Sequence, residues 1–357
     1  MSDKSCLLIT DIHPKLACKG GVEYLFNSQI YPALKENDYT VHLWVAAGPN
    51  PKGSVEAFST NWDVVIALKE SSALFNLATQ CPAKTRVAFF NTDIKFAGWN
   101  GNETEEELND ILQAFDVIYC PSEASKLSLE EYLDGVENPM SRIEVFTPSI
   151  PKQFLNEECI NDAYCGCGVT KYRLLMVGNY RREKAIAKTI RTLKPLLDTG
   201  KYHLTIVGGH SESERITKEV QAHAAAFPEH ITLAGAADQT TVAKFMKESH
   251  LLLNASAYES FSLVIRQALY LGLPVLTVHT PGIVENIYSY TTKPSSVIVP
   301  DLDFFVPTLN TLFDLQGYAL DKIRCELGIL AKQGCPEIAE QKSIEACKKF
   351  IKLISSK

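Results

Sequence analysis

Two stretches of this 357-residue sequence combine charged and small polar residues at spacings that suit a phosphorylated ligand. The first, LLMVGNYRREKAIAKTI, places Arg181, Arg182 and Lys184 where a predicted strand over 172–178 gives way to a predicted helix near 183–198. Basic side chains are favoured at the end of a helix rather than at its start. Three of them here indicate a negatively charged ligand such as a phosphate; the alternative is a solvated surface.

The second stretch, LLLNASAYESFSLVIRQALYLGLPVLTVHTPGIVENI, places Glu259 at the predicted start of a helix, with Gln267 two turns further along the same face. The first N–H groups of a helix have no partner within it. Those of Phe261, Ser262 and Leu263 would therefore be free to bind a pyrophosphate. The alternative is that Glu259 is only a first-turn carboxylate that complements the helix dipole.

Two pairs of glycines follow predicted strands. Gly20 and Gly21 precede a helix predicted to begin near Val22, and Gly208 and Gly209 end the run LTIVGG. Glycine lets backbone N–H groups approach a ligand closely, so both pairs are candidates for the wall of a nucleotide site. A structural turn that requires positive φ is the alternative for each pair.

The elements that would position these residues form two series, in which short apolar runs alternate with longer amphipathic segments. Such alternation is typical of strand-helix units that build a parallel sheet. The predicted strands of the first series are CLLIT, TVHLWVA, DVVIAL, RVAFF, DVIYC and RIEVF, with helices near 22–36, 71–79, 104–115 and 122–134. Those of the second are YRLLMVG, YHLTIVGG, HITLAG, HLLLNAS, LPVLTV and SSVIVP, with helices near 183–198, 212–226, 239–248 and 260–271.

A polar, turn-rich segment that begins with Pro148 and Pro151 separates the two series. We therefore expect an α/β protein with a first Rossmann-like domain over 1–150, a linker over 151–170 and a second Rossmann-like domain over 171–335. The last segment, 336–357, has helical spacing of its apolar residues. This helix needs a surface to cover, which is either its own domain or the first one.

Composition limits the possible functions. The chain is 46% hydrophobic and 22% charged, which is ordinary globular usage. No apolar run approaches the ~18 residues of a membrane-spanning helix, and the start lacks the pattern of a signal peptide, so we expect a soluble, cytoplasmic protein. Nothing in the composition excludes peripheral contact with a membrane.

Charge is distributed unevenly between the two halves. The net charge of −7 argues against nucleic acid as a partner. Residues 1–150 carry 11 basic and 21 acidic side chains, a net of −10, whereas the remainder carries 24 basic and 21 acidic ones, a net of +3. An anionic ligand is therefore expected in the second half.

The ten cysteines are scattered through predicted strands and helices, so we expect buried free thiols rather than disulfides. The one cluster, Cys159, Cys165 and Cys167, has no second close pair of cysteine or histidine residues that would complete a tetrahedral zinc site. No structural metal is expected.

The order of these motifs resembles that of the retaining family-4 glycosyltransferases of GT-B fold. The resemblance is carried by GGVE, VGNYRREK, LTIVGG and YESFSLVIRQALYLGLPVLTVHTPGIVE, covers most of the chain and is strongest over 172–286. The family pattern is similar to E-G-F-G-L-x-x-x-E-A; this chain reads ESFSLVIRQA from Glu259 to Ala268. The resemblance implies two Rossmann-like domains that face a central cleft.

The resemblance also implies a function. A nucleotide-sugar donor would bind mainly to the second domain, without a metal ion or another cofactor, and a glycan, protein or other hydroxyl group would accept the sugar with retention of configuration. The implied catalytic residues are Glu259 on the sugar and Lys184 on the diphosphate. The implied donor-binding residues are Gly20, Gly21, Asn179, Arg181, Arg182, Gly208, Gly209, Ser260, Phe261, Ser262, Leu263, Gln267, Gly282 and Glu285.

Three positions depart from the family pattern. The second glutamate is Gln267, which keeps one carbonyl acceptor for a ribose but loses the charge. Asn179 stands where the family usually has an arginine, for which Arg181 or Arg182 could substitute. In the first domain, FFNTDIKF offers Asp93 without a histidine before it, so His13 and Asp93 are the candidates for the acceptor side.

Other functions remain open at this point. A catalytically idle GT-B protein that binds a nucleotide sugar or regulates a partner would explain Gln267 and Asn179. GT-B epimerases and phosphorylases share the architecture, and only the motif over 259–268 argues against them. A nucleotide-dependent dehydrogenase is disfavoured because no G-x-G-x-x-G opens either half.

Overall fold

The computed structural model describes most of the chain. The described residues are 4–10, 24–46, 54–68, 72–91, 105–133, 142–151, 154, 171–209, 213–290, 296–313, 321–323, 325–327 and 335–356. The chain divides into two compact units, of which the first comprises residues 1–149 and 340–357 and the second residues 150–339.

The first unit contains a six-stranded parallel sheet in the order β2-β1-β3-β4-β5-β6. Its strands are β1 (Lys4–Thr10), β2 (Tyr39–Val45), β3 (Trp62–Ala67), β4 (Ala83–Phe89), β5 (Val117–Cys120) and β6 (Arg142–Val145). The helices described in this unit are η2 (Phe26–Ile30), α2 (Tyr31–Glu36), α3 (Ser54–Ser59), α4 (Ser72–Gln80), α5 (Glu105–Gln113), α6 (Glu123–Leu133) and most of α15 (Cys335–Ser355). Helix α3 was not predicted from the sequence.

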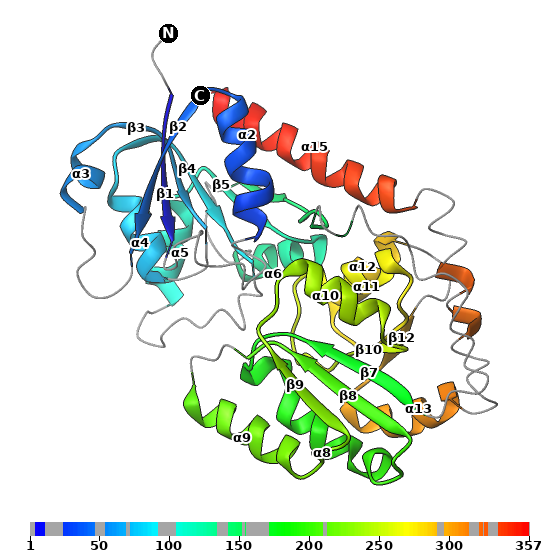
Figure 1. Cartoon of the computed structure of the whole chain (residues 1–357). Helices are drawn as coiled ribbons and strands as arrows, with labels where there is room; N and C mark the ends of the chain where they lie inside the picture. Colours follow the sequence, from blue (N-terminus) through cyan, green and yellow to red (C-terminus); the bar gives the residue numbers. More distant parts are fainter. Residues whose placement is uncertain are drawn as a thin grey trace. The chain divides into compact units, whose positions relative to one another are not determined.

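The C-terminal helix α15 packs on the first unit beside α2 (Figure 1). Its residue Phe350 is fully buried, with ring centroids 6.1 Å from Phe89, 5.7 Å from Tyr119 and 6.0 Å from Phe146. The amide of Gln29 also donates a hydrogen bond to the thiol of Cys347. Helix α15 therefore covers the first sheet, through contacts between aromatic rings.

The second unit contains another six-stranded parallel sheet, in the order β12-β11-β10-β7-β8-β9. Its strands are β7 (Tyr172–Val177), β8 (Tyr202–Val207), β9 (Ile231–Gly235), β10 (Leu251–Asn254), β11 (Val275–Val278) and β12 (Ser296–Val299). Its helices include η3 (Arg182–Lys184), α8 (Ile186–Leu197), α9 (Glu214–Ala225), α10 (Gln239–Lys247), α11 (Leu263–Leu271), α12 (Pro281–Tyr290), η4 (Leu302–Phe304) and α13 (Phe305–Phe313). Every strand falls on an apolar run that predicted it, and the prediction of two parallel-sheet α/β units is confirmed.

Both faces of the second sheet are covered by helices (Figure 1). Along β7, Leu174 and Met176 belong to the core beneath α8, α9 and α13, whereas Leu175 belongs to the core beneath α10, α11 and α12. Successive side chains of a strand point to opposite faces, so a strand covered on both sides must be apolar throughout. This burial is the physical reason for the continuous apolar runs in the sequence.

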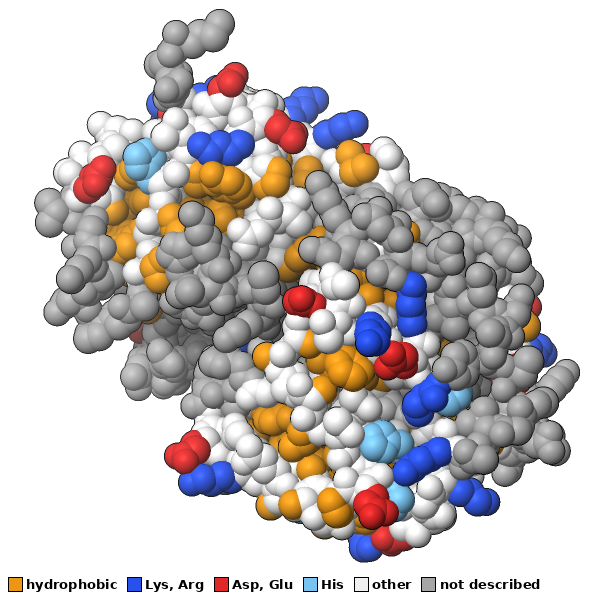
Figure 2. All heavy atoms as spheres, in the orientation of Figure 1, with side chains coloured by type: hydrophobic (Ala, Val, Ile, Leu, Met, Phe, Trp, Pro, Cys, Tyr) orange, Lys and Arg blue, Asp and Glu red, His pale blue; other side chains and the backbone are white. Residues whose placement is uncertain are grey.

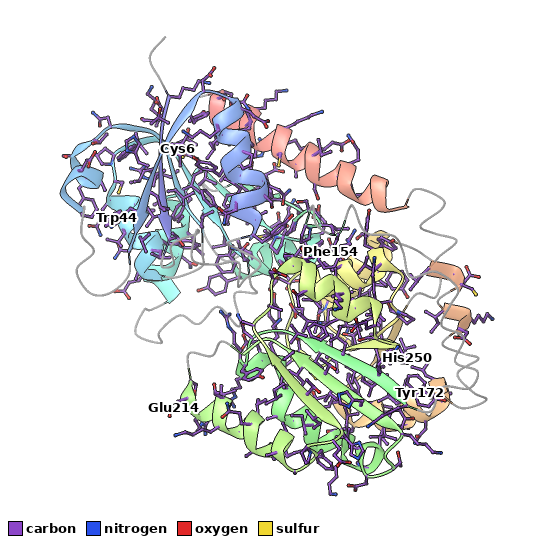
Figure 3. All side chains as sticks on the ribbon, in the orientation of Figure 1. Cys6, Trp44, Phe154, Tyr172, Glu214 and His250 are labelled. Atoms are coloured by element: carbon purple, nitrogen blue, oxygen red, sulfur yellow. The ribbon has the colours of Figure 1, made fainter. Side chains whose placement is uncertain are left out.

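A polar contact fixes β7 against β10 at their amino ends, where Tyr172 and His250 lie close together (Figure 3). The backbone N–H of Arg173 donates to Nδ1 of His250 over 2.9 Å, and the backbone N–H of His250 donates to the carbonyl of Arg173 over 2.8 Å. The register of the two strands is thereby set, and their carboxyl ends come to one edge. Loops at this edge are where open parallel sheets bind ligands.

On the face of the second unit drawn in Figure 2, basic and acidic side chains are interspersed. In the described part of the chain, no helix has the length and apolar character required to cross a membrane. Cys6, Cys81 and Cys120 are buried and form no disulfide among the residues that the structure describes, and burial raises the pKa of the Cys81 thiol to about 11. Cys325, by contrast, is exposed.

Candidate functional site

The first site segment is the tight turn that follows β7. The backbone N–H of Lys184 donates to the carbonyl of Arg181 over 3.2 Å, which closes the 3₁₀ turn η3. Ala185 then adopts a left-handed conformation with φ of 51°, and α8 begins only at Ile186. The helix predicted near 183–198 is present but begins three residues later, because a left-handed residue separates the basic cluster from it.

Gly208 brings the ends of β7 and β8 into contact beside this turn. Its φ is +139°, and a Cβ at this position would lie closer than 3.0 Å to the carbonyl group of Gly178. The backbone N–H of Gly178 in turn donates to the carbonyl of Val207 over 2.9 Å. A glycine is thus required at 208 by close backbone packing, which is the structural role considered for this pair.

The second site segment is the loop after β10, whose shape is set by Asn254. The backbone N–H of Ser256 donates to Oδ1 of Asn254 over 2.9 Å, and Nδ2 of Asn254 donates to Oγ of Ser262 over 3.2 Å. Ser262 is buried and left-handed, with φ of 56° and ψ of 86°, and α11 begins after it at Leu263. A left-handed serine is uncommon and indicates backbone strain that the surroundings hold in place.

The late start of α11 corrects two predictions. Glu259 precedes the helix by four residues, so it does not share a helical face with Gln267. The first backbone bond of the helix runs from Arg266 N–H to the carbonyl of Ser262. The N–H groups without a partner inside the helix therefore extend from Ser262 through Ile265, rather than from Phe261 through Leu263.

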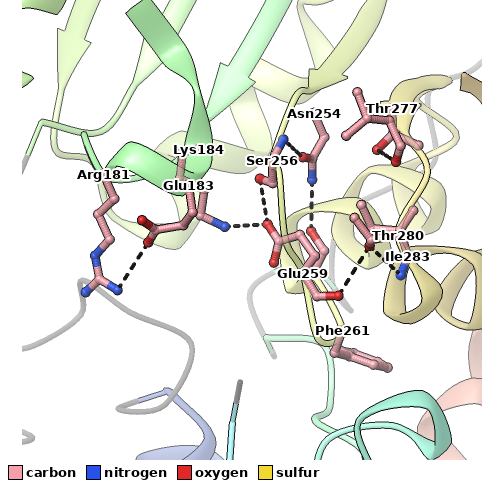
Figure 4. A network of polar contacts seen from close by, with 12 residues as sticks. Arg181, Glu183, Lys184, Asn254, Ser256, Glu259, Phe261, Thr277, Thr280 and Ile283 are labelled. Carbon is pink, nitrogen blue, oxygen red and sulfur yellow. Dashed lines mark hydrogen bonds and ion pairs between the residues drawn. The ribbon is translucent and has the colours of Figure 1, made fainter. Parts of the chain in front are cut away.

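The two segments meet at an ion pair between Lys184 and Glu259 (Figure 4). Nζ of Lys184 donates to Oε1 of Glu259, which also accepts from Oγ of Ser256 over 3.0 Å. The side chains are 28% and 12% exposed respectively, so the pair is shielded yet reachable from solvent. A backbone bond from Ala257 N–H to the carbonyl of Glu183, 2.8 Å long, joins the segments directly. The two residues predicted to be catalytic therefore lie in contact.

Thr280 and helix α12 hold the loop after β10 in place. Oγ1 of Thr280 donates to the carbonyl of Glu259 over 3.3 Å. A Cβ on Gly282 would lie closer than 3.0 Å to the carbonyl oxygens of both Glu259 and Ser260. Gly282 is therefore needed for the loop to lie against the helix, which gives this predicted site residue a supporting position.

Asn286 and Arg266 complete this support, and neither was identified from the sequence. Nδ2 of Asn286 donates to the carbonyl of Ser262 over 2.8 Å and to that of Phe261, while its Oδ1 accepts from Nε of Arg266 over 2.7 Å. Both side chains are almost fully buried. A signal was available, since Asn286 falls between Ile283 and Ile287 on the apolar face of a helix. A polar residue there indicates a buried hydrogen bond.

Gln267 is buried on α11, where its Nε2 donates to Oε1 of Gln239 over 2.9 Å. Gln239 is the first residue of α10 and is half-buried. Among the other predicted donor residues, Asn179 and Glu285 are half-buried. Gly20, Gly21, His13 and Asp93, like the cluster Cys159, Cys165 and Cys167, lie outside the described residues.

Arg181 and Arg182 do not join the Lys184–Glu259 pair. Figure 4 shows the Arg181 side chain directed away from Lys184, and it forms an ion pair with Glu183 over 3.8 Å. Both arginines instead line a separate cavity of ≈ 650 Å³ with Ala185 and Ala257. Within the described ranges, no group of three or more histidine, cysteine, aspartate or glutamate side chains could hold a metal ion.

Part of the chain is similar to a known protein family. Residues 167–297 match the family model described as Glycosyl transferases group 1. No curated protein sequence matches the chain.

Among solved structures, the fold is similar to that of sucrose-phosphate synthase from Thermosynechococcus elongatus, with a TM-score of 0.71 and 15% identity over 99% of this chain and 100% of that one. It is also similar to Anabaena Alr3699/HepE in complex with UDP and glucose, with a TM-score of 0.66 and 13% identity over 98% and 99%. A glycosyltransferase from Rickettsia africae ESF-5 gives 0.62 and 15% over 99% and 100%. The chain therefore has the two-sheet GT-B fold of these structures, and its residues 167–297 are similar to the family of glycosyl transferases group 1.

Proposed function

We propose that this protein is a retaining, metal-independent glycosyltransferase. It binds a nucleotide sugar on its second unit and transfers the sugar to a hydroxyl group of a glycan, a protein or another acceptor. The observation that carries the proposal is the contact of Lys184 with Glu259 at the carboxyl edge of the sheet, inside the segment that matches the family. The complexes of Alr3699/HepE with UDP and with UDP-glucose make a uridine nucleotide the first donor to test.

Lys184 is proposed to bind the diphosphate of the donor. An ammonium group has three donors, so Nζ can keep its bond to Glu259 and still reach a phosphate oxygen. The backbone N–H groups of Ser262 through Ile265 lie at the start of α11, where the helix dipole favours negative charge. Together these groups stabilise the charge that develops on the leaving diphosphate, which is where an enzyme gains most of its rate.

Glu259 is proposed to bind hydroxyl groups of the donor sugar. An ionised carboxylate offers about four acceptor positions. Bonds from Lys184 and Ser256 occupy Oε1, so the carboxylate has capacity left for a ligand. Because Thr280 and Gly282 fix the backbone of this residue, its carboxylate is held in place before a ligand binds.

The proposed reaction breaks the bond between the anomeric carbon and the diphosphate oxygen, and forms the bond to the acceptor oxygen on the same face of the sugar. The acceptor proton passes to the leaving diphosphate, so no protein base is required. A lysine and a set of amides supply the positive charge that a cation would otherwise supply. We expect activity to persist in excess EDTA; its loss there, with recovery on adding Mg²⁺, would refute metal independence.

The remaining predicted residues have supporting roles in this proposal. Gln267 binds the ribose hydroxyls through its carbonyl oxygen, while Gln239 accepts from its amide nitrogen. Gly282 and Glu285 lie in α12, beside the loop after β10 that carries Glu259. Gly20 and Gly21 with the donor, and His13 and Asp93 with the acceptor, stay predictions from the sequence.

An idle protein that binds a nucleotide sugar without turning it over is the second candidate. The observation that favours it is that Gln267, which stands where the family pattern has a glutamate, is buried and hydrogen-bonded to Gln239. The two candidates differ in turnover rather than in binding.

One experiment tests both candidates. The full chain is screened by thermal shift with UDP-, GDP- and ADP-sugars, where a ligand at 100 times its Kd stabilises by ~2.7 kcal/mol. Donors that bind are then incubated with the protein and followed by proton NMR, which reports hydrolysis, transfer and the anomeric configuration of the product. Binding with neither hydrolysis nor transfer would favour the idle protein, and an inverted product would refute the proposed stereochemistry.

A further inference from the structure

A cavity of ≈ 650 Å³ in the second unit has a strongly basic lining that the donor site does not use. It lies beside the carboxyl ends of β10, β11 and β12, next to the starts of α8 and α9. Five cationic side chains line it, namely Arg181, Arg182, Lys188, Arg191 and Arg215. Cavities that bind small molecules commonly measure about 300–1,000 Å³, so this one is large enough for a metabolite.

Two of the five cations are already paired. Arg181 contacts Glu183 over 3.8 Å, and Arg191 contacts Glu219 over 3.6 Å. The other carboxylate of the lining, Asp301, caps η4 by accepting a hydrogen bond from the backbone N–H of Asp303 over 2.8 Å. Glu219 is therefore paired within the lining, and Asp301 caps a neighbouring turn.

The other three cations lie outside these two ion pairs. Among the residues that the structure describes, Arg182, Lys188 and Arg215 form no ion pair and no side-chain hydrogen bond. They come from three different elements, η3, α8 and α9, and converge on one cavity. Cationic side chains gathered at one concave surface create a positive potential there, which attracts an anion.

The chemistry of the lining identifies the anion. A phosphate group carries about −1.5 to −2 charge near neutral pH, so two phosphate groups match three unpaired cations better than one does. Guanidinium groups such as those of Arg182 and Arg215 bind phosphate oxygens in a bidentate manner. Ile186, Val278 and Leu302 supply an apolar surface for the carbon skeleton of the ligand.

We propose that this cavity binds a small molecule with two phosphate groups, linked as a diphosphate or carried at two positions, separately from the nucleotide sugar. Two residues of one turn take part in different sites: Lys184 of η3 is bonded to Glu259, whereas Arg182 lines the cavity. Neither Lys184 nor Glu259 is among its lining residues. This site does not depend on the proposed transfer reaction.

The test is a calorimetric titration of the full chain with inorganic pyrophosphate at physiological ionic strength. The cavity variant is Arg182→Ala/Lys188→Ala/Arg215→Ala, whose three side chains are exposed and support no described contact of the fold. Its matched control is Lys201→Ala/Lys218→Ala/Lys244→Ala, which removes the same charge from exposed positions outside the lining. Arg215→Ala alone serves as a second cavity variant.

We expect pyrophosphate to bind the wild-type protein at two sites. The cavity variant should lose one site, with affinity reduced at least tenfold, while Lys184→Ala should lose the other. Unchanged affinity and stoichiometry in the cavity variant would overturn the proposal. An equal loss in the control would do so too, since it would show attraction by net charge rather than a site.

Discussion

The ammonium group of Lys184 and the carboxylate of Glu259 lie in hydrogen-bond contact, although 75 residues separate them in sequence. Each follows a neighbouring strand of the second sheet, since β7 pairs with β10. Because parallel strands end at the same edge, the sheet topology itself brings the two loops together.

Replacing either member of this pair should impair catalysis. For Lys184→Ala we expect kcat/KM to fall about 100-fold or more, because a charge partner of the transition state is lost, and Glu259→Gln should cause a comparable loss. The double variant should lose less than the product of the two, since the residues act together. Lys194→Ala, an exposed residue of α8, is the control. A Lys184→Ala enzyme with an unchanged rate would exclude this assignment.

Gln267→Glu should leave donor affinity equal or improve it by up to about tenfold, because a carboxylate makes charge-assisted bonds to ribose hydroxyls. The amide of Gln239 can turn to donate to the new carboxylate, so the contact between the two side chains survives. Calorimetry with the identified donor measures the effect. If the carboxylate abolishes binding, the ribose role of this position is wrong.

Strain at Ser262 can be measured by comparing two substitutions. Ser262→Gly and Ser262→Ala both remove the hydrogen bond with Asn254, but only glycine tolerates a φ of 56° without cost. We expect the glycine variant to be more stable than the alanine variant by about 1–2 kcal/mol in urea denaturation. Ala222→Gly, in the exposed interior of α9, should show the opposite order, with glycine less stable by about 0.5–1 kcal/mol. Equal stability of the two Ser262 variants would show that the backbone there is relaxed.

Gly282→Ala should displace the loop after β10, which carries Glu259 and Ser260. The new Cβ would overlap the backbone carbonyls of Glu259 and Ser260, which cannot move without shifting the loop. We expect a stability loss of about 1–3 kcal/mol and weaker donor binding. Gly178→Ala is a suitable control for stability, because its Cβ would contact only Lys184, at an ordinary 3.8 Å. A fully stable Gly282→Ala protein with normal donor affinity would contradict this prediction.

Asp63 should contribute to stability in a pH-dependent way. Hydrogen bonds from the ammonium group of Lys84 and the backbone N–H of Ser5 hold the pKa of the Asp63 carboxyl below its ordinary value. A carboxyl with a lowered pKa stabilises the fold above its unfolded pKa of about 3.9, and that contribution is lost as the pH falls through the folded pKa.

The variant Asp63→Asn should accordingly be less stable than wild type by about 1 kcal/mol at neutral pH, near the low end of the range because the carboxylate is partly exposed. The difference should shrink as the pH falls below about 4. Denaturation with urea at several pH values measures it, with Asp198→Asn in an exposed pair as the control. A difference that does not change with pH would mean that the charge of Asp63 is not involved.

The strands could be predicted from the sequence because both sheets are covered on two faces, which forces runs such as Leu174–Leu175–Met176 to be apolar throughout. The pairing of Lys184 with Glu259 could also be anticipated, since loops after parallel strands share an edge. The start of α11 could not. Its position depends on Ser262 being held in a left-handed conformation by Asn254 and Asn286, which are distant partners that no local pattern reveals.

The direction of the basic side chains after β7 was equally hidden from the sequence. Arg181, Arg182 and Lys184 appear as one cluster along the chain, yet in the 3₁₀ turn Lys184 contacts Glu259, whereas the arginines line the basic cavity. Because a 3₁₀ turn has about three residues per revolution, its successive side chains point in directions that differ from those in an α-helix. Residue spacing alone could not assign these side chains to two sites.

The contact of Phe350 with Phe89, Tyr119 and Phe146 has a consequence for how the protein is made. A ribosome synthesises the strands of the first unit before the second unit, but it synthesises residues 340–355 of α15 after the second unit. The second unit can therefore acquire its complete core while the first still exposes aromatic rings. Domains generally fold in the order of their synthesis, but of these two units the one whose strands are made first is completed second.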